Sequence, residues 1–241
     1  MTVIQAPLGA IDRMRRTLVP GHVLVTIEHL LIVTWRIPIA EMRGMLPPAL
    51  EPVVDGNETL ISAVLFRNRD LRPARIGLLR LSSFQMNVRS YVRDPATGEP
   101  GSVYFHGLYL SRRWIAKVSA SLFNVPFAYL PFGITVADDD RLEWSARDRN
   151  GRVDVSAVEA DAPLDSAMVD LLTNPHTGYF ADRSGALRKW SIWHRPQQLR
   201  TVRIVRARLA DLPLGESREA WKALYVRSVD YEVYLPSTPA S

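Results

Sequence analysis

The feature that most constrains the fold is a long series of strand-like segments separated by turns. Clusters such as Asp55-Gly56-Asn57 and Arg149-Asn150-Gly151 divide the segments, and sequences of this type favour tight hairpins. The segments are rich in β-branched and aromatic residues and cover residues 23–35, 59–66, 85–93, 103–110, 127–136, 141–147, 152–159, 186–194, 201–209 and 224–235. This pattern predicts a large antiparallel sheet.

Helical segments are few and short. We expect them at residues 39–45, 111–124, 165–172 and 216–223, with Asp165 as an N-cap and Asn174-Pro175 as a stop signal. No internal repeat or linker-like stretch divides the chain, so we expect one domain over residues 1–241, of which residues 1–20 could form a mobile segment. The predicted fold class is α+β, with a mainly antiparallel sheet curled into a barrel and a few short helices packed on it.

Composition and motifs exclude several kinds of chemistry. The chain has no cysteine, which removes thiolate nucleophiles, cysteine-ligated metals and disulfides. Phosphate-binding glycine loops, the HExxH zinc motif and the GxSxG nucleophile motif are also missing. The five histidines are widely separated, and a metal site made by His106 with His22 or His29 is the less favoured alternative. We therefore expect no metal and no cofactor.

Charge and hydropathy argue against a nucleic-acid partner and a membrane partner. The formal net charge of +5 comes from arginines that are mixed with acidic residues along the whole chain. The longest apolar run, residues 22–35, is interrupted by Thr26, Glu28 and His29 and is too short to span a membrane. The first twenty residues lack the apolar core of a signal peptide, so we expect a cytoplasmic location. The sequence leaves open whether the protein forms a homo-oligomer.

Polar residues alternate with apolar ones on the strand that follows Phe84. Alternation places Gln85, Asn87, Arg89 and Tyr91 on one face of this strand. That face either meets solvent or lines an internal cavity, where each polar group needs a hydrogen-bond partner. The next strand also mixes polar and aromatic residues, namely Tyr104, Phe105, His106 and Tyr109. Two neighbouring strands of this kind are typical of a sheet that holds a ligand, although half-buried sheets have similar sequences.

A set of short motifs, taken in their order, points to a family. They are Trp35-Arg36 before a short helix, residues 46–51 (LPPALE), 87–92 (NVRSYV), 103–110 and 115–126, and, more weakly, His194-Arg195-Pro196. Together they resemble the YqjF-like proteins, a bacterial family of unknown function related to the acetoacetate decarboxylase-like superfamily. The resemblance spans residues 23–209 and implies the α+β barrel of that superfamily.

The resemblance also implies where catalytic groups would stand. Decarboxylases of the superfamily form a Schiff base on one of two adjacent lysines that follow the proline after the helix. Those two positions are Phe127 and Ala128 in this chain. The two catalytic glutamates of the family fall near Ser62 and at Gln85, and its substrate-binding arginine falls near Glu28. The resemblance therefore implies the fold and the cavity without the Schiff-base chemistry.

No other lysine is well placed to replace the missing pair. If residues 111–124 are helical, Lys117 lies roughly 110° from the centre of the apolar stripe and faces solvent. That stripe consists of Trp114, Ile115, Val118 and Leu122. Lys189 and Lys222 stand in segments with no corresponding motif, and we interpret them as surface charges.

We therefore predict a pocket protein for a small organic molecule that is not an acetoacetate decarboxylase. The expected ligand-binding residues are Trp35, Phe105, Phe127, Gln85, Asn87, Arg89, Tyr91 and Glu28. An alternative is an enzyme that uses the same cavity for acid–base chemistry, such as a cyclisation, dehydration or aldol-type step in secondary metabolism. Its expected proton-transfer residues are His106 with Tyr104 or Tyr109. A structural or protein-interaction role is a third possibility, which a filled core would favour.

The partner of Arg89 is a separate question. A buried guanidinium stays charged and needs a carboxylate from the protein or from a ligand. Glu28 and Glu58 are the candidates within the chain, and we expect Glu28 to pair with Arg89.

Overall fold

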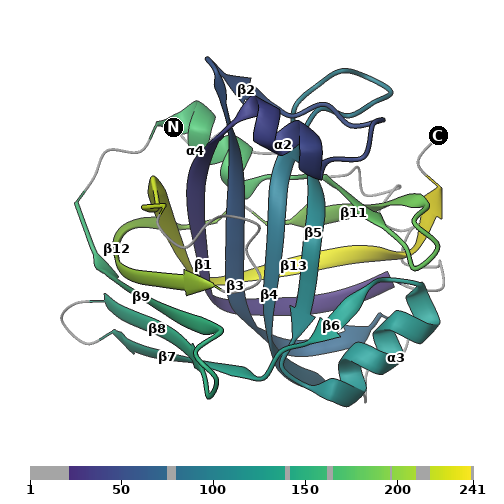
Figure 1. Cartoon of the computed structure of the whole chain (residues 1–241). Helices are drawn as coiled ribbons and strands as arrows, with labels where there is room; N and C mark the ends of the chain where they lie inside the picture. The colour runs from purple at the N-terminus through teal and green to yellow at the C-terminus, as the bar shows by residue number, and fades with distance from the viewer. Residues whose placement is uncertain are drawn as a thin grey trace.

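The fold is built almost entirely from strands (Figure 1). The computed structural model describes residues 22–74, 80–138, 142–161, 165–195, 197–209 and 218–239. Its strands are β1 (His22–Pro38), β2 (Val54–Asp55), β3 (Glu58–Pro73), β4 (Leu81–Val92), β5 (Ser102–Leu110), β6 (Phe127–Tyr129), β7 (Phe132–Asp138), β8 (Leu142–Asp148), β9 (Val153–Glu159), β10 (Thr177–Ala181), β11 (Leu187–His194), β12 (Leu199–Leu209) and β13 (Lys222–Pro239). The helices in the described residues are α2 (Ile39–Met45), α3 (Arg113–Phe123) and α4 (Ser166–Thr173).

Seven of these strands close into a ring. They follow the order β1-β3-β4-β5-β10-β11-β13, and β13 pairs back with β1. Every neighbouring pair in the ring is antiparallel except β5 with β10. The predicted α+β fold with a curled, mainly antiparallel sheet is thus confirmed. Because the ring is closed, one face of each of its strands is turned toward a common interior.

A second layer of strands packs against the outside of the ring. β12, β9, β8 and β7 extend the sheet from β13, and their apolar residues join one core with β1, β3 and β4. Trp144 of β8 belongs to this core and donates its indole N–H to the carbonyl oxygen of His29 at 2.9 Å. Leu31 also lies in this core, whereas its neighbour Ile32 lies in the core inside the ring. Side-chain alternation along β1 therefore supplies both cores from one strand.

The three helices match the sequence expectations closely. α2 has the predicted bounds, and α3 and α4 agree within two residues. The predicted N-cap is confirmed, since the Asp165 carboxylate accepts hydrogen bonds from the backbone N–H groups of Ala167 and Met168. α3 ends at Asn124 in the left-handed conformation, with φ 54°.

Three local expectations were wrong or incomplete. Residues 218–221 are not helical and β13 begins at Lys222, although the predicted helix at 216–223 falls partly outside the described residues. The predicted strand 127–136 is divided at Leu130-Pro131, because a proline cannot donate a ladder hydrogen bond. β10 was missed, since its five residues contain a glycine and follow Asn174-Pro175. The expected mobile segment, residues 1–20, lies outside the described residues.

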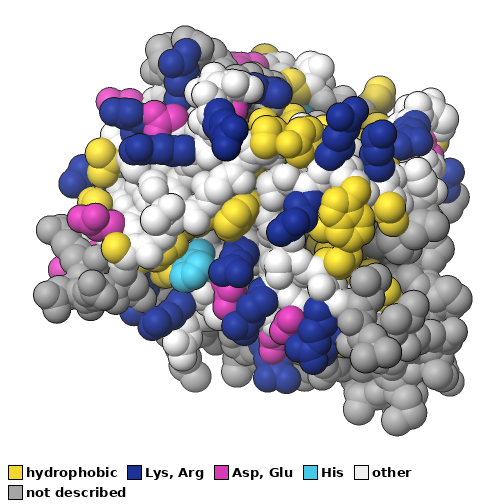
Figure 2. All heavy atoms as spheres, turned by 90° about the horizontal axis from the view of Figure 1, so that it is seen from below, with side chains coloured by type: hydrophobic (Ala, Val, Ile, Leu, Met, Phe, Trp, Pro, Cys, Tyr) yellow, Lys and Arg dark blue, Asp and Glu magenta, His cyan; other side chains and the backbone are white. Residues whose placement is uncertain are grey.

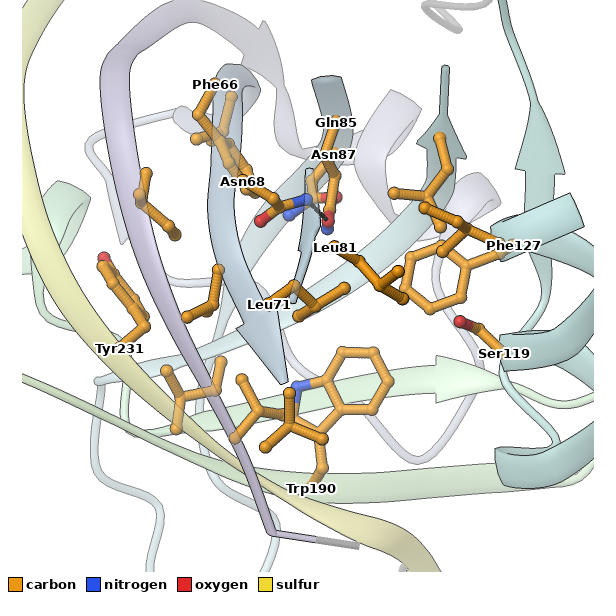
Figure 3. Close-up of a pocket in the computed structure, with 18 of the residues that line it drawn as sticks. Phe66, Asn68, Leu71, Leu81, Gln85, Asn87, Ser119, Phe127, Trp190 and Tyr231 are labelled. Carbon is orange, nitrogen blue, oxygen red and sulfur yellow. Dashed lines mark hydrogen bonds between the residues drawn. The ribbon is translucent and has the colours of Figure 1, made fainter. Parts of the chain in front are cut away.

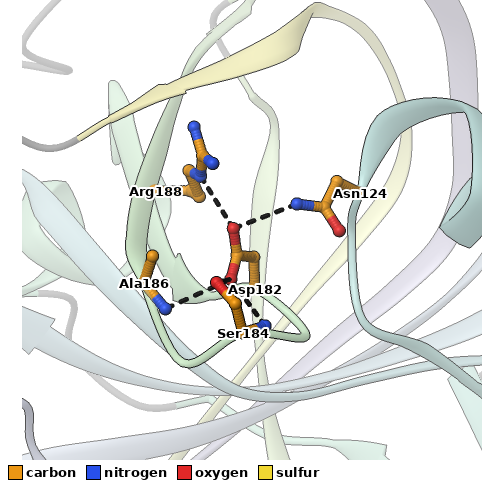
Figure 4. Close-up of polar contacts among 5 residues, drawn as sticks. All are labelled: Asn124, Asp182, Ser184, Ala186 and Arg188. Carbon is orange, nitrogen blue, oxygen red and sulfur yellow. Dashed lines mark hydrogen bonds and ion pairs between the residues drawn. The ribbon is translucent and has the colours of Figure 1, made fainter.

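A buried carboxylate holds the turn between β10 and β11 (Figure 4). The side chain of Asp182 is only 1% exposed and accepts five hydrogen bonds. The donors are Ser184 N and Oγ, Ala186 N, Arg188 Nε and Asn124 Nδ2, at 2.6 to 3.1 Å. The hydrogen bonds from Ser184 and Arg188 hold the pKa of Asp182 well below its usual range. Because Asn124 ends α3, the same carboxylate ties that helix to the β10–β11 hairpin.

None of the described helices has both the length and the apolar character needed to cross a bilayer.

Candidate ligand-binding cavity

The ring encloses a cavity of about 260 Å³ (Figure 3). On several ring strands alternate residues point into it, as Val25 and Ile27 of β1 and Gln85, Asn87 and Arg89 of β4 do. The apolar lining includes Val25 and Ile27 of β1, Val64 and Phe66 of β3, Phe105 of β5, and Trp190 and Ile192 of β11. A cavity with this lining suits an apolar molecule better than a fully polar one.

One end of the cavity opens beside helix α3. Trp114 and Val118 of α3 line the cavity, yet they are 50% and 47% exposed. Leu71 of β3 and Leu81 of β4 are paired neighbours that also line this end. Viewed from below, the molecule shows hydrophobic side chains set among many Lys and Arg side chains (Figure 2). Along β4 the lining therefore runs from Leu81 at the opening to Arg89 in the interior.

Three side-chain amides form a hydrogen-bonded chain on one wall of the cavity (Figure 3). Asn68 Nδ2 donates to Gln85 Oε1 at 2.9 Å, and Gln85 Nε2 donates to Asn87 Oδ1 at 2.9 Å. Asn68 Nδ2 also lies 3.3 Å from Ser83 Oγ. We call Asn68, Gln85 and Asn87 the amide chain. It brings hydrogen-bonding groups, but no charge, to a mostly apolar wall.

Arg89 lies further inside, 7% exposed, and also lines the cavity. Its Nη2 donates to the carbonyl oxygen of Leu172, in the last turn of α4, at 2.6 Å. Its Nε is buried and has no hydrogen-bond partner within the described residues. Among those residues no carboxylate forms an ion pair with Arg89. The guanidinium is therefore only partly satisfied.

The expected pair between Arg89 and Glu28 is wrong. Glu28 pairs instead with Arg69 at 3.0 Å and Arg67 at 3.9 Å. Ile27 points into the cavity, so alternation along β1 turns Glu28 to the outside. Glu58, the other candidate, lies 3.4 Å from Arg36.

Tyr231 of β13 is a polar cavity residue that the sequence did not identify. Its hydroxyl oxygen accepts a hydrogen bond from Gln197 Nε2 at 3.1 Å, and its ring packs on His194 with centroids 4.7 Å apart. Burial raises the pKa of Tyr231 to about 12, and burial lowers the pKa of His194. The charge of Arg89 acts on both groups. Tyr231 thus remains a neutral hydroxyl near the guanidinium.

The structure brings together five of the eight predicted ligand-binding residues. Gln85, Asn87, Arg89, Phe105 and Phe127 all line the cavity. Tyr91 faces the same interior but lies beneath the lining, where its hydroxyl is 2.8 Å from Ser62 Oγ. Glu28 faces outward, as described above. Trp35 lies in the core between the two layers and donates its indole N–H to the carbonyl oxygen of Arg218.

The residues predicted for proton transfer are not part of the cavity lining. Tyr104 and Tyr109 pack with the core between the layers, on the other face of β5 from Phe105. The His106 ring lies 4.9 Å from Tyr104 in an edge contact, and its Nε2 is 3.0 Å from Ser90 Oγ. Burial lowers the pKa of His106 to about 4 and raises that of Tyr104. The pairing of β4 with β5 has a register shift between Val88 and Arg89: Val88 pairs with Gly107 and Arg89 with Phe105, so His106 lies at the bulge.

None of the three lysines of the chain lines the cavity. Lys117 is exposed on α3, in agreement with the helix-face prediction, and Phe127 lines the cavity where the resemblance implies a lysine. Of the predicted apolar stripe of α3, Ile115 packs inward, whereas Trp114 and Val118 border the cavity opening.

Asn68 and Trp190 were also missed by the sequence analysis. Asn68 could have been found, since it stands two residues after Phe66 and so shares its face of β3. Trp190 and Tyr231 offered no such signal, because their positions depend on how β11 and β13 close the ring.

The histidines bind separate partners. His22 Nε2 lies 3.2 Å from Glu232, and His29 Nδ1 lies 3.0 Å from the Tyr225 hydroxyl. In the part of the chain that the structure describes, no three His, Asp or Glu side chains come together as metal ligands would.

Solved structures with this fold include enzymes and decarboxylases. The enduracididine biosynthesis enzyme MppR, in complex with the condensation product of pyruvate and imidazole 4-carboxaldehyde, is 14% identical, with a TM-score of 0.61 over 100% of this chain and 97% of that one. MppR in complex with pyruvate gives 12% identity and a TM-score of 0.60, over 100% and 96% of the two chains. An acetoacetate decarboxylase from Legionella pneumophila is 13% identical, with a TM-score of 0.59 over 92% of this chain and 88% of that one. At these identities the likeness shows the fold alone.

Sequence comparison gives the family. A search of curated proteins found no match to this chain. A family model described as an uncharacterized conserved protein (COG2071) matches residues 25–229, which include all the ring strands in whole or in part. The chain belongs to this family, DUF2071.

Proposed function

We propose that this protein binds a small organic anion with an apolar body in the ring cavity, with Arg89 facing the anionic group. The observation that carries the proposal is the buried guanidinium of Arg89, which lines the cavity without a carboxylate partner among the described residues. An arginine cannot lose its proton in a protein, so its charge must be balanced in another way.

Electrostatics favours a carboxylate or a similar anion at this point. Burying an unpaired charge costs several kcal/mol, and the carbonyl of Leu172 at the end of α4 offsets only part of it. A carboxylate can accept two parallel hydrogen bonds from one guanidinium. Tyr231 can add a neutral hydroxyl donor, because its raised pKa keeps it protonated. An anionic group would thus meet donors from both side chains.

The comparisons support a small carboxylate only by analogy. MppR, which shares the fold, was solved with pyruvate bound, and pyruvate is a small carboxylate. Acid–base catalysis by His106 with Tyr104 or Tyr109 is less well supported, because none of the three lines the cavity.

A matched pair of probes tests the proposal. ω-Phenylhexanoate and its neutral amide have nearly the same size, so calorimetric titration of both isolates the contribution of the charge. We expect the carboxylate to bind at least about tenfold more tightly, and Arg89→Met to remove that preference. Arg67→Met, on the outside of β3, is the control and should keep it. Equal binding of the two probes, or a preference that survives Arg89→Met, would show the proposal to be wrong.

The same proposal excludes imine chemistry. Because the cavity contains Phe127 and no lysine, borohydride treatment with acetoacetate should leave no covalent adduct, as mass spectrometry of the intact protein would show. An adduct on Lys117 would contradict the placement of that side chain on the exposed face of α3.

A further inference from the structure

We infer that the amide chain is a second recognition point, which selects a ligand with one neutral hydrogen-bonding group between its anionic end and its apolar body. The inference rests on the proposed function, which places the anionic end at Arg89. It adds the chemical class of the ligand: a monoanion with a hydroxyl or carboxamide in its middle, rather than a plain fatty or aryl acid or a dianion.

The hydrogen bonds within the amide chain leave both of its ends available. The chain uses Asn68 Nδ2, both polar atoms of Gln85, and Asn87 Oδ1. No described residue bonds the two remaining atoms, Asn87 Nδ2 and Asn68 Oδ1, and both residues line the cavity. The chain therefore offers the ligand one donor, at Asn87, and one acceptor, at Asn68.

The amide chain can also reverse its direction. If all three amides turn by 180°, each hydrogen bond is kept with donor and acceptor exchanged, and Asn87 then presents an oxygen. Ser83 Oγ, 3.3 Å from Asn68 Nδ2, can act as donor or acceptor in either arrangement. A hydroxyl group, which both donates and accepts, suits either state. The three residues thus recognise a neutral polar group without fixing its direction.

Because the amide chain carries no charge, it should bind a neutral polar group of a ligand more tightly than a charged one. None of its members can titrate, and the neighbouring lining residues Phe66 and Val64 are apolar. The charged residues of the lining are Arg89, which the anionic end occupies, and Arg72, which follows Leu71 at the opening. A second carboxylate placed here would lose its water without gaining a counter-charge. A hydroxyl loses much less on leaving water and regains a hydrogen bond. The cavity should therefore discriminate against dicarboxylates.

Spacing along β4 fixes where the neutral group must lie. Asn87 and Arg89 are two residues apart on one face, which is about 7 Å along a strand, and Gln85 lies the same distance further toward the opening. The anionic end consequently lies innermost and the apolar body points to the opening. There Trp114, Val118 and Phe127 offer apolar contacts.

The test uses probes that share the anionic end. ω-Phenylhexanoate is compared with a set of positional isomers of its hydroxy derivative, each with one hydroxyl at a different carbon, and with a derivative that carries a second carboxylate. We expect one hydroxyl isomer to bind about tenfold more tightly than the parent, and the dicarboxylate to bind more weakly than the parent. Asn87→Leu, which keeps the branched shape of the side chain and removes an end of the amide chain, should abolish the hydroxyl gain while the parent still binds.

Control variants distinguish failure of the amide-chain inference from failure of the proposed anion binding at Arg89. Asn57→Ala changes an exposed amide outside the cavity and should retain the hydroxyl gain. Gln85→Met breaks the amide chain at its centre and replaces Asn87→Leu if that variant does not fold. If the parent binds but no isomer gains, or if the gain survives both substitutions, the inference is overturned and the proposed function stands. If neither the parent nor any isomer binds, both are overturned.

Discussion

Two buried charges in this molecule have opposite surroundings. Asp182 accepts five hydrogen bonds from the protein, one of them from the guanidinium of Arg188. Arg89 donates one, to a backbone carbonyl, and keeps a buried Nε without a partner in the described residues. A buried charge whose partners are all internal belongs to the scaffold, because breaking such a set of contacts destabilises the fold. Arg89 lies on a cavity wall and has no carboxylate partner among the described residues, so its charge is available to a ligand, and this contrast identifies the site.

The largest expected effect is on the satisfied charge. Asp182→Asn removes the negative charge and replaces one of the two acceptor oxygens by an N–H donor, which then faces other donors. We expect the melting temperature to fall on the order of 10 °C in a thermal melt at neutral pH. Asp55→Asn is the control, because its carboxylate is 53% exposed and its pair with Arg36 should contribute little. A fall no larger than that of the control would mean that Asp182 is not a structural centre.

The pH dependence of that effect has a definite sign. The pKa of Asp182 is depressed in the folded state, so its contribution is present above the unfolded pKa of about 3.8 and is lost as the pH falls below it. The difference in melting temperature between the native protein and Asp182→Asn should accordingly shrink below about pH 4.

A third titratable group, His106, is partly buried and has neither the many partners of Asp182 nor the permanent charge of Arg89. Its hydrogen bond with Ser90 and its edge contact with Tyr104 suit the neutral ring, and burial lowers its pKa to about 4. The unfolded chain takes up a proton below about pH 6.5, so stability is full above that pH and declines as the pH falls toward 4. The loss amounts to at most about 3 kcal/mol. Urea unfolding of His106→Gln between pH 7 and 4 should show a correspondingly smaller decline than the native protein.

The sequence could predict the ring far better than the cavity. Alternation in β4 correctly turned Gln85, Asn87 and Arg89 to one interior face, because residues two apart share a face whatever the tertiary fold. The same rule does not say which face of β5 meets the cavity. Phe105 and His106 are both predicted as site residues, and only Phe105 lines the cavity. The bulge between Val88 and Arg89 is invisible in the residue types.

Long-range closure explains the remaining gaps. Trp190 and Tyr231 reach the cavity only because β11 pairs with β13 and β13 pairs with β1. The paired residues of β1 and β13 are about two hundred positions apart in the chain. The resemblance implies that Glu28 lies at the site, near the position of the family's substrate-binding arginine, whereas its partners Arg67 and Arg69 lie across the β1–β3 ladder on the outside. Pairing partners of this kind are fixed by register, which the sequence of one strand does not specify.

Arg89 should respond quite differently from Asp182. Arg89→Met removes one hydrogen bond to Leu172 but also removes a buried charge that lacks a counter-charge, so the two effects oppose each other. We expect the free energy of unfolding to change by less than about 1 kcal/mol in either direction. A melting temperature that falls as far as that of Asp182→Asn would place Arg89 in the scaffold and would remove the contrast.

The smallest expected effect is the coupling between Arg89 and Glu28. Since Ile27 points into the cavity, Glu28 lies outside, where Arg69 is 3.0 Å away, and the two charges have no direct contact. The losses of unfolding free energy from Arg89→Met and Glu28→Gln should therefore add, within about 0.5 kcal/mol, in a double-mutant cycle measured by urea unfolding. The matched cycle of Glu28→Gln with Arg69→Met should show a coupling of about 0.2–1 kcal/mol, as expected for a partly exposed pair. A coupling of more than 1 kcal/mol between Arg89 and Glu28 would mean that the carboxylate turns inward and satisfies the guanidinium. The charge at the end of the cavity would then need no ligand.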